Sequence, residues 1–248
     1  SRVFSGASAS PETAKKVKKA AKQLGYRPNV LARAMITGKS RIIGLIVAYL
    51  DNQFYPEALE RLSNALQAQG YHILVFTVSN TKQEVQEVIQ ELLDYQVDGI
   101  ITASVGMSSD LTSLCEVAGI PVVMFNRAQD GGATSAVTSA ARQMMESAAP
   151  PDALFVGNDH MAFAVLDTLR FDMGLRVPDD VAIVGFDDVP LAAWPSFNLT
   201  TVRQPLNRMV TATTDLIISQ ITEGATSAQR IAFDGPLITR GTTRTLKG

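Results

Sequence analysis

Short apolar segments alternate with amphipathic segments after residue 41, and this alternation limits the fold more than any other feature of the chain. The apolar run 42–48 precedes the segment 56–69, in which three leucines recur at helical spacing. The same order repeats at 72–78 and 82–95. Strands that alternate with helices predict an α/β fold built from doubly wound parallel sheets.

Ligands of such folds bind outside the carboxyl ends of the strands. The loops after the predicted strands, at 49–55, 104–107 and 126–127, are therefore candidate binding segments. Asp159 occupies the same kind of position, because it follows an apolar run and opens a predicted helix. Asp187 and Asp188 also end an apolar run, and we expect them to support turns.

Charge divides the chain into a basic head and an acidic body. Residues 1–41 hold ten lysines and arginines and one acid, Glu12, whereas the remaining residues hold 12 basic and 23 acidic side chains. This arrangement indicates a head that binds a polyanion, attached to a globular core. A solvated helix surface is the alternative explanation of the lysines.

The composition favours a cytoplasmic protein that is not an enzyme. Cys115 is the only cysteine, which is compatible with a reducing cytosol. No apolar run approaches the roughly 20 residues that span a bilayer, and no signal peptide is visible. His72 and His160 make no metal set, and the common catalytic motifs are absent. We expect no cofactor, no metal and no membrane association.

The basic head predicts two helices. Ser10 is suited to cap a helix over 10–24, which Gly25 would end. Pro28 disfavours helical geometry at the preceding residue, and Asn29 can then cap a second helix of about eight residues. A helix of that length is too short to be stable alone in water.

The head resembles the C-terminal half of the helix-turn-helix head of the lactose-repressor (LacI) family of bacterial transcription regulators, in the sequence GYRPN at 25–29 and in Ala32. The resemblance implies a hinge helix at 29–36 that inserts an apolar wedge into the minor groove. Met35 holds the wedge position, where the family more often has Leu. The DNA-binding residues implied are Ser1, Arg2, Tyr26, Arg27, Asn29, Leu31, Ala32, Arg33 and Met35.

The body resembles the same family in eight segments that follow the family's order, among them VDGII at 97–101 and GFDD at 185–188. This implies a two-lobed periplasmic-binding-protein-like core with an effector between the lobes. The domains implied are a partial helix-turn-helix head with hinge helix at 1–40 and a core at 41–248. Lobe one would comprise about 41–139 and 203–224, and lobe two about 140–202 and 225–248.

Two parts of the family pattern are missing. The first helix and most of the recognition helix of the head are absent from the sequence given. Lobe two would lack its first strand, a helix with an effector-binding arginine, and the next strand. We expect an omitted segment and a break between Ser139 and Ala140, because a lobe without these strands would leave sheet edges open.

The candidate effector-binding residues each have a structural alternative. The carboxylate of Asp159 could cap a helix, Phe54 and Tyr55 could pack within their loop, and Trp194 could pack between the lobes. Asn126 and Arg127 end a strand at the predicted cleft, where Arg127 suits an anionic or hydroxylated ligand. The full set is Phe54, Tyr55, Asn126, Arg127, Asp159 and Trp194.

The resemblance implies a sequence-specific DNA-binding regulator, most simply a repressor, that acts as a homodimer or a tetramer. A sugar or sugar derivative would bind between the lobes and change the affinity for operator DNA. A solute-binding protein of a transport system shares the same core and is the alternative from another functional class. The basic head and the missing signal peptide argue against it.

Overall fold

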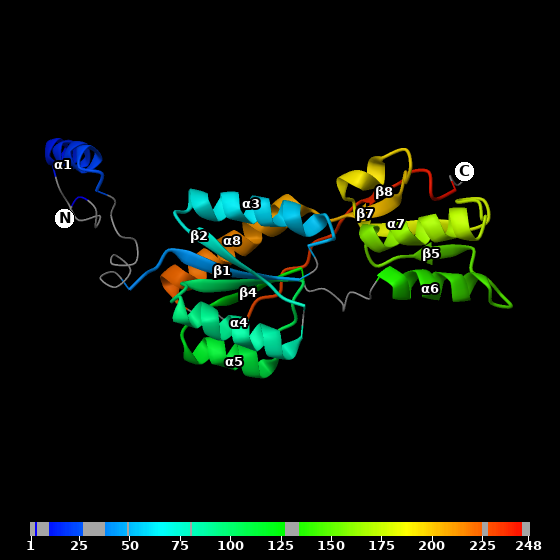
Figure 1. Cartoon of the computed structure of the whole chain (residues 1–248), viewed down its shortest axis with the longest axis horizontal. Helices are drawn as coiled ribbons and strands as arrows, with labels where there is room; N and C mark the ends of the chain where they lie inside the picture. The colour runs from blue at the N-terminus through cyan, green and yellow to red at the C-terminus, as the bar shows by residue number, and fades with distance from the viewer. Residues whose placement is uncertain are drawn as a thin grey trace.

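The computed structural model describes residues 3, 10–26, 38–48, 50–79, 81–126, 134–224 and 228–244 (Figure 1). Helix α1 (Pro11–Gln23) confirms the predicted helix of the basic head. The hydroxyl of Ser10 accepts a hydrogen bond from the Thr13 amide, and Gly25 follows the helix with a φ of 65°. None of the residues of α1 is buried, and the predicted hinge helix at 29–36 lies outside the described residues.

Lobe one is built on a parallel sheet in the order β2-β1-β3-β4. Its strands are β1 (Ile42–Val47), β2 (His72–Thr77), β3 (Gly99–Ala103) and β4 (Val122–Phe125). Figure 1 shows helices α3 (Phe54–Ala68) and α8 (Leu206–Glu223) on one face and α4 (Lys82–Asp94) and α5 (Ser109–Val117) on the other. Strands β1 and β3 are almost wholly buried, as expected for strands covered by helices on both faces.

Lobe two has a second sheet in the order β5-β6-β7-β8. Strands β5 (Ala153–Phe155), β6 (Ala182–Asp187) and β7 (Thr200–Arg203) are parallel, and the short β8 (Leu237–Ile238) is antiparallel to β7. Helix α7 (Asp159–Asp167) packs on β6 and continues into η1 (Thr168–Asp172). The 3-10 turn η2 (Pro190–Ala193) connects β6 toward β7.

One helix crosses the predicted boundary between the lobes. Helix α6 (Thr134–Met145) runs without interruption through Ser139 and Ala140, so the predicted chain break is not found there. Helix α6 packs against α7 and η1, which are elements of lobe two. Among the helices that the structure describes, none combines the length and the apolar character needed to cross a membrane.

Candidate effector-binding site

The carboxyl ends of strands from both lobes meet around the side chain of Asp187. Asn52, in the loop after β1 of lobe one, donates its side-chain amide to Asp187 Oδ2 at 2.9 Å. Gln204, directly after β7, donates its side-chain amide to Asp187 Oδ1 at 2.5 Å. One carboxylate at the end of β6 thus joins lobe one to lobe two.

Asp187 is held in an electrostatic environment that favours its protonated form. Burial raises the pKa of its carboxyl to about 7, against the hydrogen bonds from Asn52 and Gln204, and the nearby charge of Asp159 raises it further. Its backbone also has a φ of 127°, which is unusual for a residue other than glycine. A shifted pKa and a strained backbone at one position are typical of functional sites.

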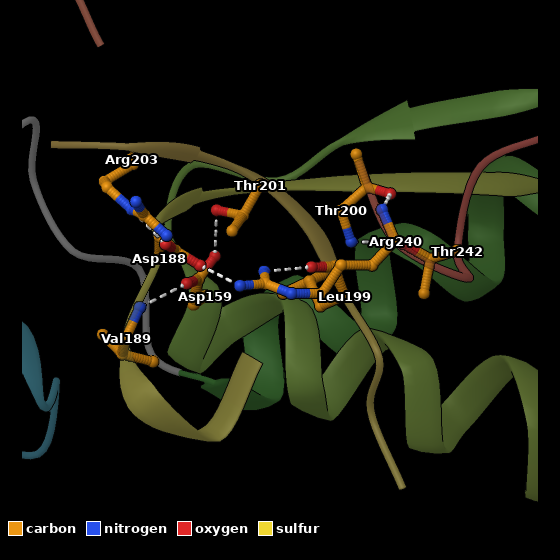
Figure 2. Close-up of polar contacts among 9 residues, drawn as sticks. All are labelled: Asp159, Asp188, Val189, Leu199, Thr200, Thr201, Arg203, Arg240 and Thr242. Atoms are coloured by element: carbon orange, nitrogen blue, oxygen red, sulfur yellow. Dashed lines mark hydrogen bonds and ion pairs between the residues drawn. The ribbon is translucent and has the colours of Figure 1, made fainter. Parts of the chain in front are cut away.

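Asp159 is the first residue of α7 and is fully buried (Figure 2). The helix cap is the neighbouring Asn158, whose side chain accepts from the Met161 amide at 2.8 Å. The Asp159 carboxylate instead accepts from Thr201 Oγ1 at 2.6 Å and from the Val189 amide at 2.9 Å. Burial raises its pKa to about 6, and these two hydrogen bonds oppose the shift. The alternative role of Asp159 as a helix cap is therefore not what the structure shows.

Asp188 binds two arginines of lobe two (Figure 2). Arg203 Nε lies 2.5 Å from its Oδ2, and Arg240 Nη2 lies 2.6 Å from its Oδ1. Arg240 also donates to the carbonyl oxygen of Leu199 at 2.7 Å. This guanidinium therefore connects the residue after β6 to the residue before β7. The expectation that Asp187 and Asp188 mainly support turns is wrong, because both carboxylates accept hydrogen bonds from other parts of the fold.

Aromatic side chains line the lobe-one side of this junction. Phe54 and Tyr55 lie in the first turn of α3 with their ring centroids 5.3 Å apart, and Phe54 stacks on Phe125 at 6.3 Å. Burial raises the pKa of Tyr55; a hydrogen bond with Ser104 opposes this shift, and the charge of Asp187 adds to it. A groove of about 1670 Å³ borders the junction, and Phe125, Asn126 and Gln204 are among its lining residues.

The structure brings part of the predicted effector set together. Phe54, Tyr55 and Asn126 gather at the carboxyl end of the lobe-one sheet, where Asn126 adopts a φ of 47° directly after β4. Asp159 is buried in the core of lobe two, where it accepts a hydrogen bond from Thr201 of β7. Trp194 follows η2 with 57% of its surface exposed, so it is the least buried described member of the set. Their role as ligands stays a prediction.

Several predicted residues lie outside the described part of the chain. Of the DNA-binding set only Tyr26 is described, and it is exposed after α1. The undescribed members of the two sets are Ser1, Arg2, Arg27, Asn29, Leu31, Ala32, Arg33, Met35 and Arg127. Within the described ranges, no group of three histidine, cysteine or acidic side chains is arranged to hold a metal ion.

Asn52, Asp187 and Gln204 are the site residues that sequence reasoning missed. Asn52 falls inside the loop 49–55, which was predicted to line the site, but nothing distinguished it there. Asp187 satisfies the same strand-end rule. Its partner Asn52 is 135 positions away, so no local pattern connects them.

Two family models match the chain. The periplasmic binding protein-like domain matches residues 102–243, and the model of periplasmic binding proteins and the sugar binding domain of the LacI family matches residues 40–138. The ribose operon repressor of Escherichia coli K12 is 22% identical over 295 positions, covering 91% of this chain and 89% of that protein. Catabolite control protein A of Priestia megaterium is 24% identical and covers 83% of each chain.

Solved structures share the fold. The transcriptional regulator CelR in complex with cellobiose superposes with a TM-score of 0.72 at 22% identity, over 97% of this chain and 94% of that chain. A LacI family regulator from Lactobacillus casei with bound sucrose gives a TM-score of 0.68 at 19% identity, over 82% of this chain and 99% of that chain.

This chain is shorter inside the alignment than its relatives. The match to the Escherichia coli repressor spans 295 positions, whereas 91% of 248 residues is about 226, which leaves roughly 70 positions without a residue of this chain. The difference is compatible with the omitted unit of lobe two, whose place in the chain stays a prediction. By the family model over residues 102–243 and by its relatives, the chain belongs to the periplasmic binding protein-like domain family, among the LacI-type transcription regulators.

Proposed function

We propose that the chain is a DNA-binding repressor whose operator affinity is changed by a sugar or sugar derivative bound between its lobes. The observation that carries the proposal is the junction at Asp187, where donors from both lobes converge on one buried carboxylate. A ligand that competes for these donors has one affinity when Asp187 connects the two lobes and another when this connection is broken. Such a difference is what couples an effector site to a distant site.

The chemistry of the junction suits a hydroxylated ligand. Sugar hydroxyls donate to carboxylates and accept from amides, so they can replace Asn52 or Gln204 as partners of Asp187. The rings of Phe54 and Tyr55 provide apolar area beside these polar groups. Asp159 is less accessible, because it is fully buried inside lobe two, whereas Asp187 lies where the two lobes meet. We place the ligand at Asp187, with Asn126, Arg127 and Trp194 as further predicted contacts.

Helix α1 supplies the basis for DNA contact. It carries five lysines and no buried residue, and Ser10 and Pro11 define its first turn. A lysine-rich exposed helix neutralises phosphates and releases their counterions, which gives salt-dependent affinity for DNA. The proposal includes a cytoplasmic homodimer. The solute-binding alternative is not favoured, because the relatives named above are transcription regulators.

A thermal-shift screen of monosaccharides and disaccharides tests the effector site. A ligand at 100 times its Kd stabilises the folded state by about 2.7 kcal/mol. We expect at least one sugar to raise the unfolding temperature of the parent and of Asp215→Asn, which alters an exposed carboxylate of α8. The same sugar should not stabilise Asp187→Asn. An equal shift in Asp187→Asn, or no shift with any sugar in the parent, would contradict the proposal.

A further inference from the structure

Asp98 holds the chain where it enters lobe one. Its Oδ1 accepts from the amide of Ser40 at 2.8 Å and from the Ser40 hydroxyl at 2.9 Å. Its Oδ2 accepts from the amide of Arg41 at 3.1 Å. One carboxylate therefore receives three hydrogen bonds from two consecutive residues that directly precede β1.

The rest of this entry point reinforces the same geometry. The Asp98 amide donates to the carbonyl oxygen of Ile42 at 2.8 Å, and the Ser40 hydroxyl accepts from the Ile42 amide at 3.2 Å. Arg41 has a φ of 60° and places its guanidinium 5.0 Å from the centre of the Tyr71 ring. A non-glycine residue is seldom found at such a φ unless surrounding contacts hold it there.

The strands that start at this entry point end at the effector-binding junction. Strands β1 and β3 are adjacent and parallel, paired from Ile43 with Gly99 to Val47 with Ala103. Asn52 lies in the loop after β1, and Ser104 directly follows β3. Asp98 thus lies at one end of a buried strand pair whose other end contacts Asp187 through Asn52.

We propose that Asp98 is a positioning residue that clamps residues 40 and 41 to the first ends of β1 and β3. The clamp fixes the direction in which the chain from the basic head joins lobe one. Its regulatory consequence rests on the proposed function. A displacement of the residues around Asp187 is transmitted along β1 and β3 to the head only while Asp98 keeps its hydrogen bonds to Ser40 and Arg41. Neither Asp98 nor Ser40 belongs to the predicted DNA- or effector-binding sets.

Hydrogen exchange of the full chain, measured residue by residue, tests the clamp directly. In Asp98→Asn one carboxylate oxygen becomes an NH2 group that faces an N–H donor. We expect the Ser40 and Arg41 amides to exchange at least tenfold faster than in the parent. Asp94→Asn is the matched control, since Asp94 is exposed at the end of α4. The amides of Leu45 and Ile101 should keep the parent's rate in both variants.

Two outcomes would overturn the clamp. Unchanged exchange at Ser40 and Arg41 would show that the carboxylate does not hold them. Equal acceleration at Leu45 and Ile101 would show a general loss of stability in place of a local role. Should Asp98→Asn not fold, Ser40→Ala replaces it. That variant removes the hydroxyl bond to Asp98, so the Ser40 and Arg41 amides should exchange faster and the Leu45 amide should not, and unchanged exchange at Ser40 and Arg41 would refute the clamp.

DNA binding separates this inference from the proposed function. The probe is a duplex that contains the region upstream of the chain's own gene, at low salt. If the parent and Asp94→Asn bind it and Asp98→Asn binds at least fivefold more weakly, the link to the head is supported. Equal binding by all three would refute that link. If the parent itself does not bind, the proposed function fails, and the exchange rates alone decide the clamp.

Discussion

The two lobes bury different kinds of side chain. The inner strands of lobe one, β1 and β3, are buried at nearly every position and are mainly apolar. In lobe two, β6 alternates between half-buried and buried positions, and its edge strand β5 is largely exposed. Among the described residues, the two buried carboxylates, Asp159 and Asp187, both lie in lobe two, together with the buried hydroxyls of Thr168, Thr200, Thr201 and Thr242.

This difference assigns different tasks to the lobes. An apolar lobe owes its stability to burial and close packing, which no ligand hydroxyl can replace. The hydrogen bonds to the buried carboxylates of lobe two can be exchanged for bonds to a ligand or water. In the proposed function, lobe one is the frame that carries the head, and lobe two supplies the carboxylate that contacts the ligand. The predictions below test this contrast.

The largest loss of stability is expected in the apolar core of lobe one. Leu62 of α3 is fully buried, and Leu62→Ala should lower the free energy of unfolding by about 3 kcal/mol through lost burial and a cavity. Chemical denaturation measures this loss. Val117→Ala, at a side chain 89% exposed, should change the free energy by less than about 0.5 kcal/mol. Similar losses of unfolding free energy in both variants would contradict the expectation that the buried apolar core stabilises lobe one.

The buried ion pairs of lobe two should contribute less than the core of lobe one. Arg240→Ala removes a 15% exposed guanidinium from Asp188 and from the Leu199 carbonyl oxygen, at an expected cost of about 2 kcal/mol. Arg203→Ala removes a 54% exposed partner of the same carboxylate and should cost about 0.5 kcal/mol. Denaturation of both variants gives the comparison, and a greater loss for Arg203 would reverse our account of this cluster.

Asp187 should give lobe two a pH dependence. Its folded pKa of about 7 lies above the ordinary 3.8, so between these values the folded state holds a proton that the unfolded state has lost. Its contribution is complete below about pH 4 and is lost as the pH rises to about 7. Relative to the parent, Asp187→Asn should therefore gain up to about 4 kcal/mol across this window.

Asp159 stays in the Asp187→Asn variant with a raised pKa of its own, so part of the pH dependence should remain. Asp215→Asn serves as the control at an exposed position and should follow the parent at every pH. Unfolding curves at several pH values supply the data. A difference between Asp187→Asn and the parent that does not change with pH would show that Asp187 does not titrate in this range.

The smallest effect is expected at the open edge of lobe two. Phe155 of β5 is 65% exposed, so Phe155→Ser should change the free energy of unfolding by less than about 0.5 kcal/mol. The variant should also associate less in size-exclusion chromatography, since an exposed edge with an apolar side chain promotes association. A loss above about 2 kcal/mol would mean that this edge is covered in solution.

Local patterns predicted strands in both lobes, because the apolar runs before Asp159 and before Asp187 coincide with β5 and β6. Apolar runs followed by amphipathic segments correctly placed β1, β2, β3 and β4. In β1 and β3 the cause is burial on both faces, which requires a continuous apolar run. The predicted boundary between the lobes at about residue 139 stays a prediction. The structure forms one helix across residues 134–145.

The site was predictable only in part. The strand-end rule selected the loop that contains Asn52 and the position of Asn126, since both depend on strand direction alone. The contact of Asn52 with Asp187 depends on how two lobes meet, and the buried hydrogen bonds of Asp159 depend on β7. Tertiary contacts of this kind leave no periodic signal in the sequence.

The most direct test of the account measures binding of the full chain to a duplex from the region upstream of its own gene. Fluorescence anisotropy would be recorded from about 50 to 200 mM salt, with and without the sugar that gives the largest thermal shift. We expect affinity that falls steeply with salt, and a sugar-dependent change that Asp187→Asn abolishes. No binding at the lowest salt, or an unaltered response to the sugar in Asp187→Asn, would contradict the account.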